Sequence, residues 1–175
     1  IVRDPQSSAL RADPKNFLGF SMVRASMPPD MMRPLLFCSL LYARDILGRE
    51  NPAVRLLSIG EEPEKGNAAV KEAHQLLLGA GLNFIGNVEG RDIPVGVCDR
   101  GPIDVVVCDG FTGNVLLKFY ESMGKVLARV LRADSPALLG SPEMAPLMRF
   151  LDYTEVGGAP LLGVRGVSII CHGST

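Results

Sequence analysis

Three short apolar runs, each followed by polar residues and glycine, dominate the middle of the chain. They cover residues 54–59, 83–85 and 104–108, and a helical stretch from about 68 to 78 lies between the first two. A second helical stretch follows the third run and reaches about Arg132. A strand that is buried on both faces has no polar side, so continuous apolar strands separated by helices are typical of a parallel sheet covered on both faces. The pattern predicts an α/β fold with a layered parallel sheet.

The flanking segments are less regular. Residues 1–27 show no sustained period, and we predict no regular element for them. Residues 30–47 are predicted to be helical, with Pro34 beginning or kinking the helix. Residues 136–150 read as a proline-containing loop with many apolar side chains, and an apolar run over 166–171 predicts a last strand.

Composition excludes several classes of protein. The 175 residues are 47% apolar, which is enough for a full core, and the formal net charge of -1 leaves no basic surface for non-specific nucleic-acid binding. The four cysteines form no C-x-x-C pair and read as reduced thiols of a cytoplasmic protein. The longest apolar stretch, 34–43, is shorter than the roughly 20 residues that a bilayer core requires.

The candidate chemistry lies just after each apolar run. Carboxyl ends of parallel strands share one edge, where ligands bind, so we expect these four turns to converge there. Glycines allow backbone N–H groups to approach a ligand, and a helix beginning at Asn67 or Asn114 would add its positive N-terminal end. The arrangement suits an anion such as phosphate. The four turns comprise residues 60–67, 86–92, 109–114 and 172–174.

A purely structural role remains an alternative at each of these positions. Glycine and asparagine after a strand are also ordinary turn residues and helix caps. The segment 60–67 resembles a P-loop only in disturbed order, and its glutamates would repel phosphate, which makes a nucleotide-binding module the weaker reading. His74 reads as a packed helix residue, whereas His172 is a better site candidate. Cys38 and Cys108 lie in apolar segments and are expected to be buried, and no metal-ligand spacing is present.

Several long motifs together resemble one known family. The motifs span about residues 30 to 175 and are closely similar to those of the PlsX family of bacterial phosphate acyltransferases, the acyl-ACP:phosphate transacylases that begin phospholipid synthesis. They are Tyr42-Ala-Arg, Leu47-Gly, Glu50-Asn-Pro, Ser58-Ile-Gly-Glu-Glu, Lys65-Gly-Asn, residues 82–92 (LNFIGNVEGRD), residues 104–118 (DVVVCDGFTGNVLLK), Gly157-Gly-Ala-Pro-Leu-Leu-Gly and His172-Gly-Ser.

The resemblance implies a fold of the phosphotransacetylase and isocitrate dehydrogenase-like kind and a homodimer. It implies transfer of a fatty acyl group from acyl carrier protein to inorganic phosphate, which gives acyl phosphate for phospholipid synthesis. It also implies a cytoplasmic protein that associates loosely with the inner face of the membrane, with residues 136–150 as the candidate contact. No metal or organic cofactor and no nucleic-acid partner is implied.

Within this reading, phosphate attacks the thioester carbonyl directly, held by Lys65 and by Asn67, Asn87 and Asn114. Asn114 also donates to the developing oxyanion, and His172 protonates the leaving thiolate. Three charged residues are expected to orient this set, although the first two would equally form a purely structural pair: Glu89, Arg91 and Asp109. The remaining expected substrate-binding residues are Gly86, Gly113, Gly173 and Ser174.

The chain also departs from the family pattern. Residues 1–27 do not match it, the family's opening half is missing, and the chain begins at Ile1 rather than at methionine. We therefore expect residues 28–175 to form the C-terminal part of a phosphate acyltransferase domain, truncated at both ends. The competing hypothesis is a non-catalytic remnant that keeps the fold and a partner surface.

Overall fold

A four-stranded parallel sheet forms the centre of the molecule. The computed structural model describes residues 19–22, 29–151, 159–160, 166 and 168–170. In spatial order the strands are β1 (Gly19–Met22), β6 (Val105–Cys108), β2 (Val54–Leu57) and β3 (Phe84–Val88), and every neighbouring pair is parallel. All four residues of β2 and of β6 are buried, which explains why these strands are apolar throughout except at Arg55.

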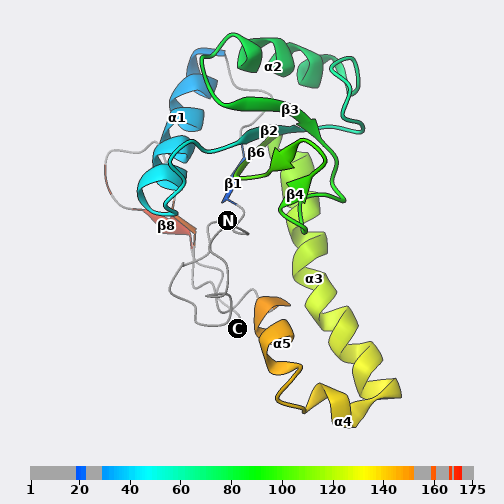
Figure 1. Cartoon of the computed structure of the whole chain (residues 1–175). Helices are drawn as coiled ribbons and strands as arrows, with labels where there is room; N and C mark the ends of the chain where they lie inside the picture. Colours follow the sequence, from blue (N-terminus) through cyan, green and yellow to red (C-terminus); the bar gives the residue numbers. More distant parts are fainter. Residues whose placement is uncertain (1–18, 23–28, 152–158, 161–165, 167, 171–175) are drawn as a thin grey trace.

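Helices α1 (Pro29–Asp45) and α2 (Ala68–Leu78) cover one face of this sheet (Figure 1). Helix α1 contacts β1 and β6, whereas α2 contacts β2 and β3. The core between them and the sheet contains Leu36, Ala43, Leu77 and alternate residues of β2 and β6, namely Val54, Leu56, Val105 and Val107. Because alternate side chains of a strand point to opposite faces, the remaining residues of these strands face the other side.

The second face carries a smaller core under a hairpin. Strands β4 (Val97–Cys98) and β5 (Gly101–Pro102) form a short antiparallel pair beside the sheet. Beneath them lie the other set of alternate residues and two residues from the connecting segments: Leu57, Val88, Val106, Cys108, Ile93 and Ile103. Arg55 also points into this side, where its side chain bonds to the backbone of β5.

A buried carboxylate joins the start of β2 to the start of β6. Asp104 accepts a hydrogen bond from the backbone N–H of Ala53 at 2.8 Å, and its other oxygen lies 3.1 Å from Nε of Arg49. Both side chains of the ion pair are largely shielded from water, so either partner alone would leave an uncompensated charge. This contact fixes the register at which the two central strands begin.

Helix α3 (Gly110–Asp134) leaves the sheet and extends well beyond it (Figure 1). Helices α4 (Pro136–Leu139) and α5 (Ala145–Leu151) turn back and contact its far part. Strands β7 (Ala159–Pro160) and β8 (Ile169–Ile170) pair with each other in an antiparallel arrangement, separately from the main sheet.

The predicted α/β class and parallel sheet are confirmed, and α2 has the predicted bounds. Three details differ. Strand β1 lies within the segment for which no element was predicted, because its four residues are too few to show a periodic pattern of apolar positions. The segment 136–150 contains two short helices rather than only loop. In the described part of the predicted last strand, β8 pairs with β7 and not with the parallel sheet, since apolar content signals burial without specifying a partner.

Candidate functional site

Three of the four predicted turns follow neighbouring strands at one edge of the sheet. The segments after β6, β2 and β3 leave the carboxyl ends of three adjacent parallel strands, the position at which α/β sheets bind ligands. The segment after β3 also reaches α3, because a Cβ atom at Gly90 would lie 4.0 Å from Leu116. Of these three turns, the one after β6 leads directly into α3 and the one after β3 lies against it.

Lys65 lies in the loop that joins β2 to α2. Its backbone N–H donates to the carbonyl of Glu62 at 3.0 Å, and its side chain is exposed. The stem of Lys65 lies so close to Gly60 that a Cβ atom there would be 2.9 Å from Lys65 Cγ and 2.8 Å from a carboxylate oxygen of Glu62. Among the described residues Lys65 takes part in no ion pair, which leaves its ammonium group available for an external anion.

Asn67 is the N-cap of α2, as predicted. Its Oδ1 atom accepts a hydrogen bond from the backbone N–H of Val70 at 2.9 Å, and its backbone is extended, as an N-cap requires. Asn67 bonds only one of the backbone N–H groups in the first turn, and the other N–H groups at this end have no acceptor within the helix. No acidic side chain lies in that turn. The start of α2 therefore presents positive partial charge two residues from Lys65.

Asn87 and Gly86 lie within β3, not in the turn that follows it. The side chain of Asn87 is 0% exposed; Nδ2 donates to the carbonyl of Glu62 at 2.8 Å, and Oδ1 lies 2.8 Å from Nδ1 of His74. Since Nδ2 of Asn87 donates, its Oδ1 accepts and Nδ1 of His74 carries the proton. Both the Oδ1 and the Nδ2 atom of Asn87 thus have partners inside the protein. The carbonyl of Glu62, to which Asn87 donates, also accepts the backbone N–H of Lys65.

Helix α3 begins four residues earlier than its predicted start at Asn114. Asp109 is its N-cap: Oδ1 accepts the N–H groups of Phe111 at 3.0 Å and Thr112 at 2.8 Å. Two glycines in the first turn, Gly110 and Gly113, made the sequence look like a loop there. Burial opposes ionisation of Asp109, but the hydrogen bonds from Thr112 and Phe111 outweigh it and lower the pKa of the carboxyl below its ordinary range.

This cap changes the electrostatics of the two helix ends. The negatively charged carboxylate of Asp109 already occupies the positive end of α3. In contrast, no negatively charged side chain lies in the first turn of α2. Asn114 is exposed in the second turn of α3, and Gly113 is buried in the first. The start of α2, with Lys65, is therefore the more favourable place for an anion.

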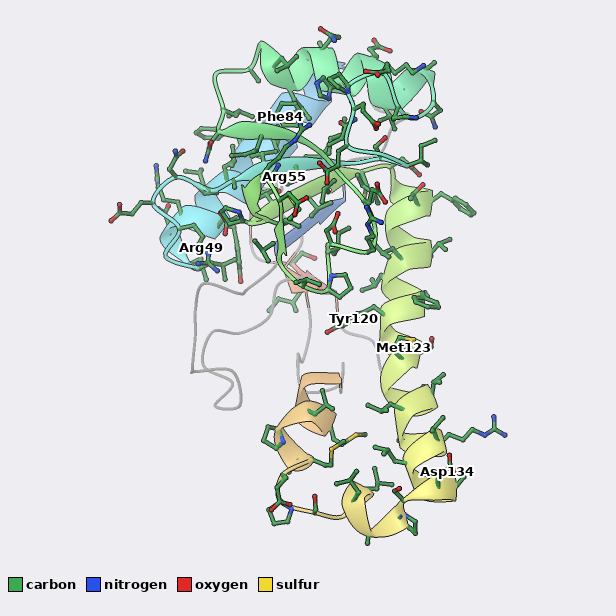
Figure 2. The ribbon with its side chains drawn as sticks, turned by 45° about the vertical axis from the view of Figure 1, so that its right-hand side comes forward. Arg49, Arg55, Phe84, Tyr120, Met123 and Asp134 are labelled. Carbon is green, nitrogen blue, oxygen red and sulfur yellow. The ribbon has the colours of Figure 1, made fainter. Side chains whose placement is uncertain are left out.

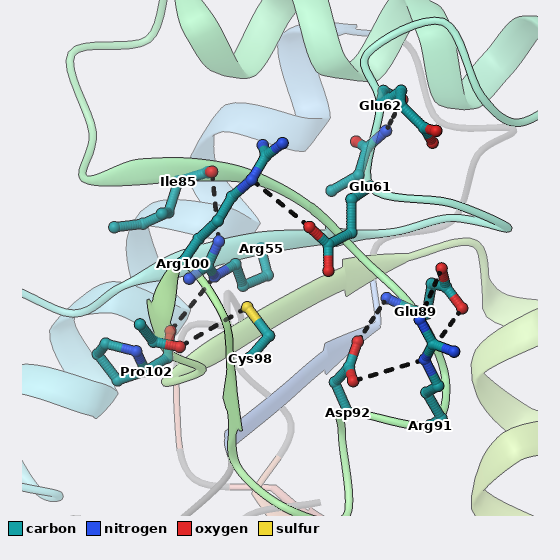
Figure 3. A network of polar contacts seen from close by, with 12 residues as sticks. Arg55, Glu61, Glu62, Ile85, Glu89, Arg91, Asp92, Cys98, Arg100 and Pro102 are labelled. Carbon is teal, nitrogen blue, oxygen red and sulfur yellow. Dashed lines mark hydrogen bonds and ion pairs between the residues drawn. The ribbon is translucent and has the colours of Figure 1, made fainter.

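The turn after β3 contains a small ion cluster (Figure 3). Nε of Arg91 lies 3.3 Å from Glu89 and 3.8 Å from Asp92, and Asp92 accepts the backbone N–H of Glu89 at 3.3 Å. The side chain of Arg91 is 74% exposed, so its ion pairs contribute little to folding stability. Two carboxylates offset its charge, and the cluster mainly fixes the shape of this turn.

The cysteines and His74 have the surroundings expected of packed residues. Burial raises the pKa of the Cys108 thiol to about 11, with a smaller contribution from Asp109, so Cys108 is a thiol at neutral pH. Cys38 is half-buried rather than buried. His74 is buried, and its ring meets Phe84 edge to face at 5.1 Å. Within the described ranges no group of three or more histidine, cysteine or acidic side chains is placed to hold a metal ion.

Three predicted site residues, His172, Gly173 and Ser174, lie outside the described residues.

The structure adds charged residues near the site that the sequence analysis did not predict: Arg55, Arg100 and Glu61 lie in or beside the loop of Lys65 (Figure 3). Nε of Arg100 is 3.5 Å from Glu61, which offsets one of the glutamates that would repel phosphate. The signal for Arg55 was present, because a charged residue inside an otherwise apolar buried strand requires a partner.

Comparison with known proteins points to one family. Residues 27–175 match the family model described as "Fatty acid synthesis protein". A curated phosphate acyltransferase of Heliobacterium modesticaldum is 51% identical over 143 residues, which cover 77% of this chain and 41% of the relative. The phosphate acyltransferase of Moorella thermoacetica is 47% identical over 155 residues, covering 84% of this chain and 44% of the relative. The chain thus spans less than half the length of these relatives.

Proposed function

The chain belongs to the fatty acid synthesis protein family, and on that basis we propose that it forms part of a phosphate acyltransferase. The proposed reaction moves a fatty acyl group from acyl carrier protein to inorganic phosphate. Acyl phosphate would then enter phospholipid synthesis. The observation that supports a phosphate site in this chain is the exposed Lys65, which forms no ion pair among the described residues, beside the first-turn amides of α2 that Asn67 does not bond.

In the proposed reaction, phosphate binds between Lys65 and the start of α2. One phosphate oxygen attacks the thioester carbonyl, the C–S bond breaks, and the carrier leaves as a thiolate. Asn114 supplies an amide donor to the oxyanion, and His172 supplies the proton for the thiolate. A phosphate held beside the thioester requires no covalent enzyme intermediate, because orientation and charge stabilisation lower the barrier.

The remaining site residues have supporting parts in this proposal. Asn67 caps α2, and Asn87 holds the loop that carries Lys65. Asp109 caps α3 and so orients the turn that bears Asn114. Glu89 and Arg91 shape the turn after β3, while Gly86, Gly113, Gly173 and Ser174 complete the border of the substrate site.

We also propose that the protein is a homodimer that contacts a membrane surface through residues 136–150. Support comes from exposed apolar side chains along α3, including Phe119, Val126 and Val130, and from Leu138 and Leu147 in the segment beyond it. In the part of the chain that the structure describes, no helix is long and apolar enough to cross a bilayer. We propose that contact with a lipid surface uses the exposed apolar side chains of residues 136–150.

A chimera tests the proposed reaction. Residues 28–175 would replace the matching part of the Heliobacterium modesticaldum relative, and release of free carrier thiol from acyl carrier protein would be followed with and without phosphate. The proposal predicts phosphate-dependent release together with formation of acyl phosphate. A folded chimera that releases no thiol, while the relative itself does, would support the non-catalytic remnant instead. Tight binding of ATP or NAD by that chimera would favour a nucleotide-binding module.

A further inference from the structure

Strand β3 contains an irregularity that determines which side chain faces α2. In the pairing with β2, Val54 is opposite Phe84, but Arg55 is opposite Gly86, so Ile85 is skipped. One extra residue in a strand moves all following side chains to the other face. Phe84 packs in the core under α2, and because of the extra residue Asn87 also faces α2, where it meets His74. Val88 then enters the core on the opposite face.

Gly86 makes this bulge possible. Its φ of 109° lies in the region that residues with a side chain rarely adopt. A Cβ atom at this position would also lie 3.2 Å from Nη1 of Arg100, whose guanidinium covers the strand here. The bulge thus combines an unusual backbone conformation with a residue, Ile85, that is skipped in the pairing with β2.

Arg55 bonds to the backbone of the skipped residue. Nη1 donates to the carbonyl of Ile85 at 3.2 Å, and Nε donates to the carbonyl of Pro102 in β5 at 3.3 Å (Figure 3). Arg55 is 0% exposed, and its Nη2 atom has no hydrogen-bond partner within the described ranges. Burying a charged side chain costs free energy unless its donors are hydrogen-bonded. Because two donors of Arg55 bond to backbone carbonyls of β3 and β5, this side chain holds the two strands in place.

We propose that Arg55 is a positioning residue for Lys65: it holds the β3 bulge, which aims Asn87 at the carbonyl of Glu62 and so fixes the loop that carries Lys65. The chain of contacts is continuous, from Arg55 to Ile85, along β3 to Asn87, and from Asn87 to the carbonyl that also binds the N–H of Lys65. The inference rests on the proposed function only in assigning phosphate to Lys65; the structural coupling stands without it.

Hydrogen exchange of the Lys65 amide in the 175-residue chain tests the coupling without any substrate. In Arg55→Met the exchange rate of this amide should rise at least about tenfold relative to that of Gly79, whose N–H caps the end of α2. Loss of overall stability alone would speed both amides together. Arg55→Lys keeps the charge but lacks the fork of donors that reaches both carbonyls, so it should raise the exchange rate of the Lys65 amide selectively but by less than Arg55→Met. This second variant keeps the test decisive if the Met variant does not fold.

Arg49→Met provides the matched control. Arg49 is also shielded from water and also has a buried partner, Asp104, but it lies at the side of the sheet beyond α1 and away from β3 (Figure 2). This variant should lose stability without a selective change at Lys65. Equal effects of the Arg49 and Arg55 variants on Lys65, or no selective effect of Arg55→Met and Arg55→Lys, would overturn the inference. In the chimera, Arg55→Lys should raise the KM for phosphate more than it lowers kcat, a readout that reports on function separately.

Discussion

The Oδ1 atom of Asn87 lies 2.8 Å from Nδ1 of His74, while Nδ2 of the same amide donates to the carbonyl of Glu62 at 2.8 Å. One buried side chain therefore joins helix α2, strand β3 and the loop of Lys65. The sequence pattern predicts this asparagine at the phosphate itself. Its burial instead makes it a structural link on which the geometry of the site depends.

Asn87→Leu should lower the free energy of unfolding by about 2–3 kcal/mol, because the variant leaves a buried imidazole N–H without an acceptor and removes one of the two donors to the carbonyl of Glu62. Urea unfolding at neutral pH measures the change. Asn83→Ala is the control, since the amide of Asn83 donates to the carbonyl of Asn51 at an exposed position and should cost less than about 1 kcal/mol. Similar costs for the two variants would contradict the role given to Asn87.

Asp109→Ala should destabilise the protein by about 1 kcal/mol through loss of the N-cap of α3. The folded-state pKa of Asp109 is lowered, so its ionised form stabilises the fold above the ordinary carboxyl pKa. That contribution is lost as the pH falls through the lowered folded-state pKa. The difference in unfolding free energy between wild type and Asp109→Ala should therefore shrink on acidification below about pH 4.

Asp134→Ala, at the other end of the same helix, is the matched control for that variant. An acidic side chain at a helix C-terminus is unfavourable to the helix dipole, so its removal should be neutral or slightly stabilising. A pH-independent effect of Asp109→Ala, or a loss of stability in Asp134→Ala of the same size, would show that capping is not the cause.

Cys108 should resist alkylation in the folded protein. With a pKa of about 11, only about 0.1% of this thiol is ionised at pH 8, and its side chain is buried at the end of β6. Cys38 and Cys98 are half-buried and should react first with iodoacetamide, as followed by peptide mass spectrometry. In urea the three should react at similar rates. Rapid labelling of Cys108 in the folded chain would mean that the end of β6 is more open than the structure shows.

Sequence patterns predicted the elements whose signals are local. The apolar runs identified β2 and β6, and Asn67 before a helical pattern identified the start of α2. The start of α3 was missed because Gly110 and Gly113 are poor helix formers, and the cap of Asp109 overrides their preference.

The contacts in the site that depend on tertiary structure could not be predicted from local sequence patterns. Gly86 and Asn87 read as a turn, but the bulge carries them inside β3. The contact of Arg55 with Ile85 joins positions 30 residues apart, and no local pattern encodes it. The exposed position of Lys65 agrees with its proposed role, which depends on an anion rather than on a protein partner.

The most direct test of the phosphate site compares two lysines in the chimera. Lys65→Ala should lower kcat/KM for phosphate by about 100-fold or more, in the range found when one stabilising donor is removed from an active site. Lys71→Ala, which removes an exposed lysine from α2 six residues further on, should leave kcat/KM within about twofold of the unmodified chimera. Equal values of kcat/KM for the two variants would contradict the placement of phosphate at Lys65 and the start of α2.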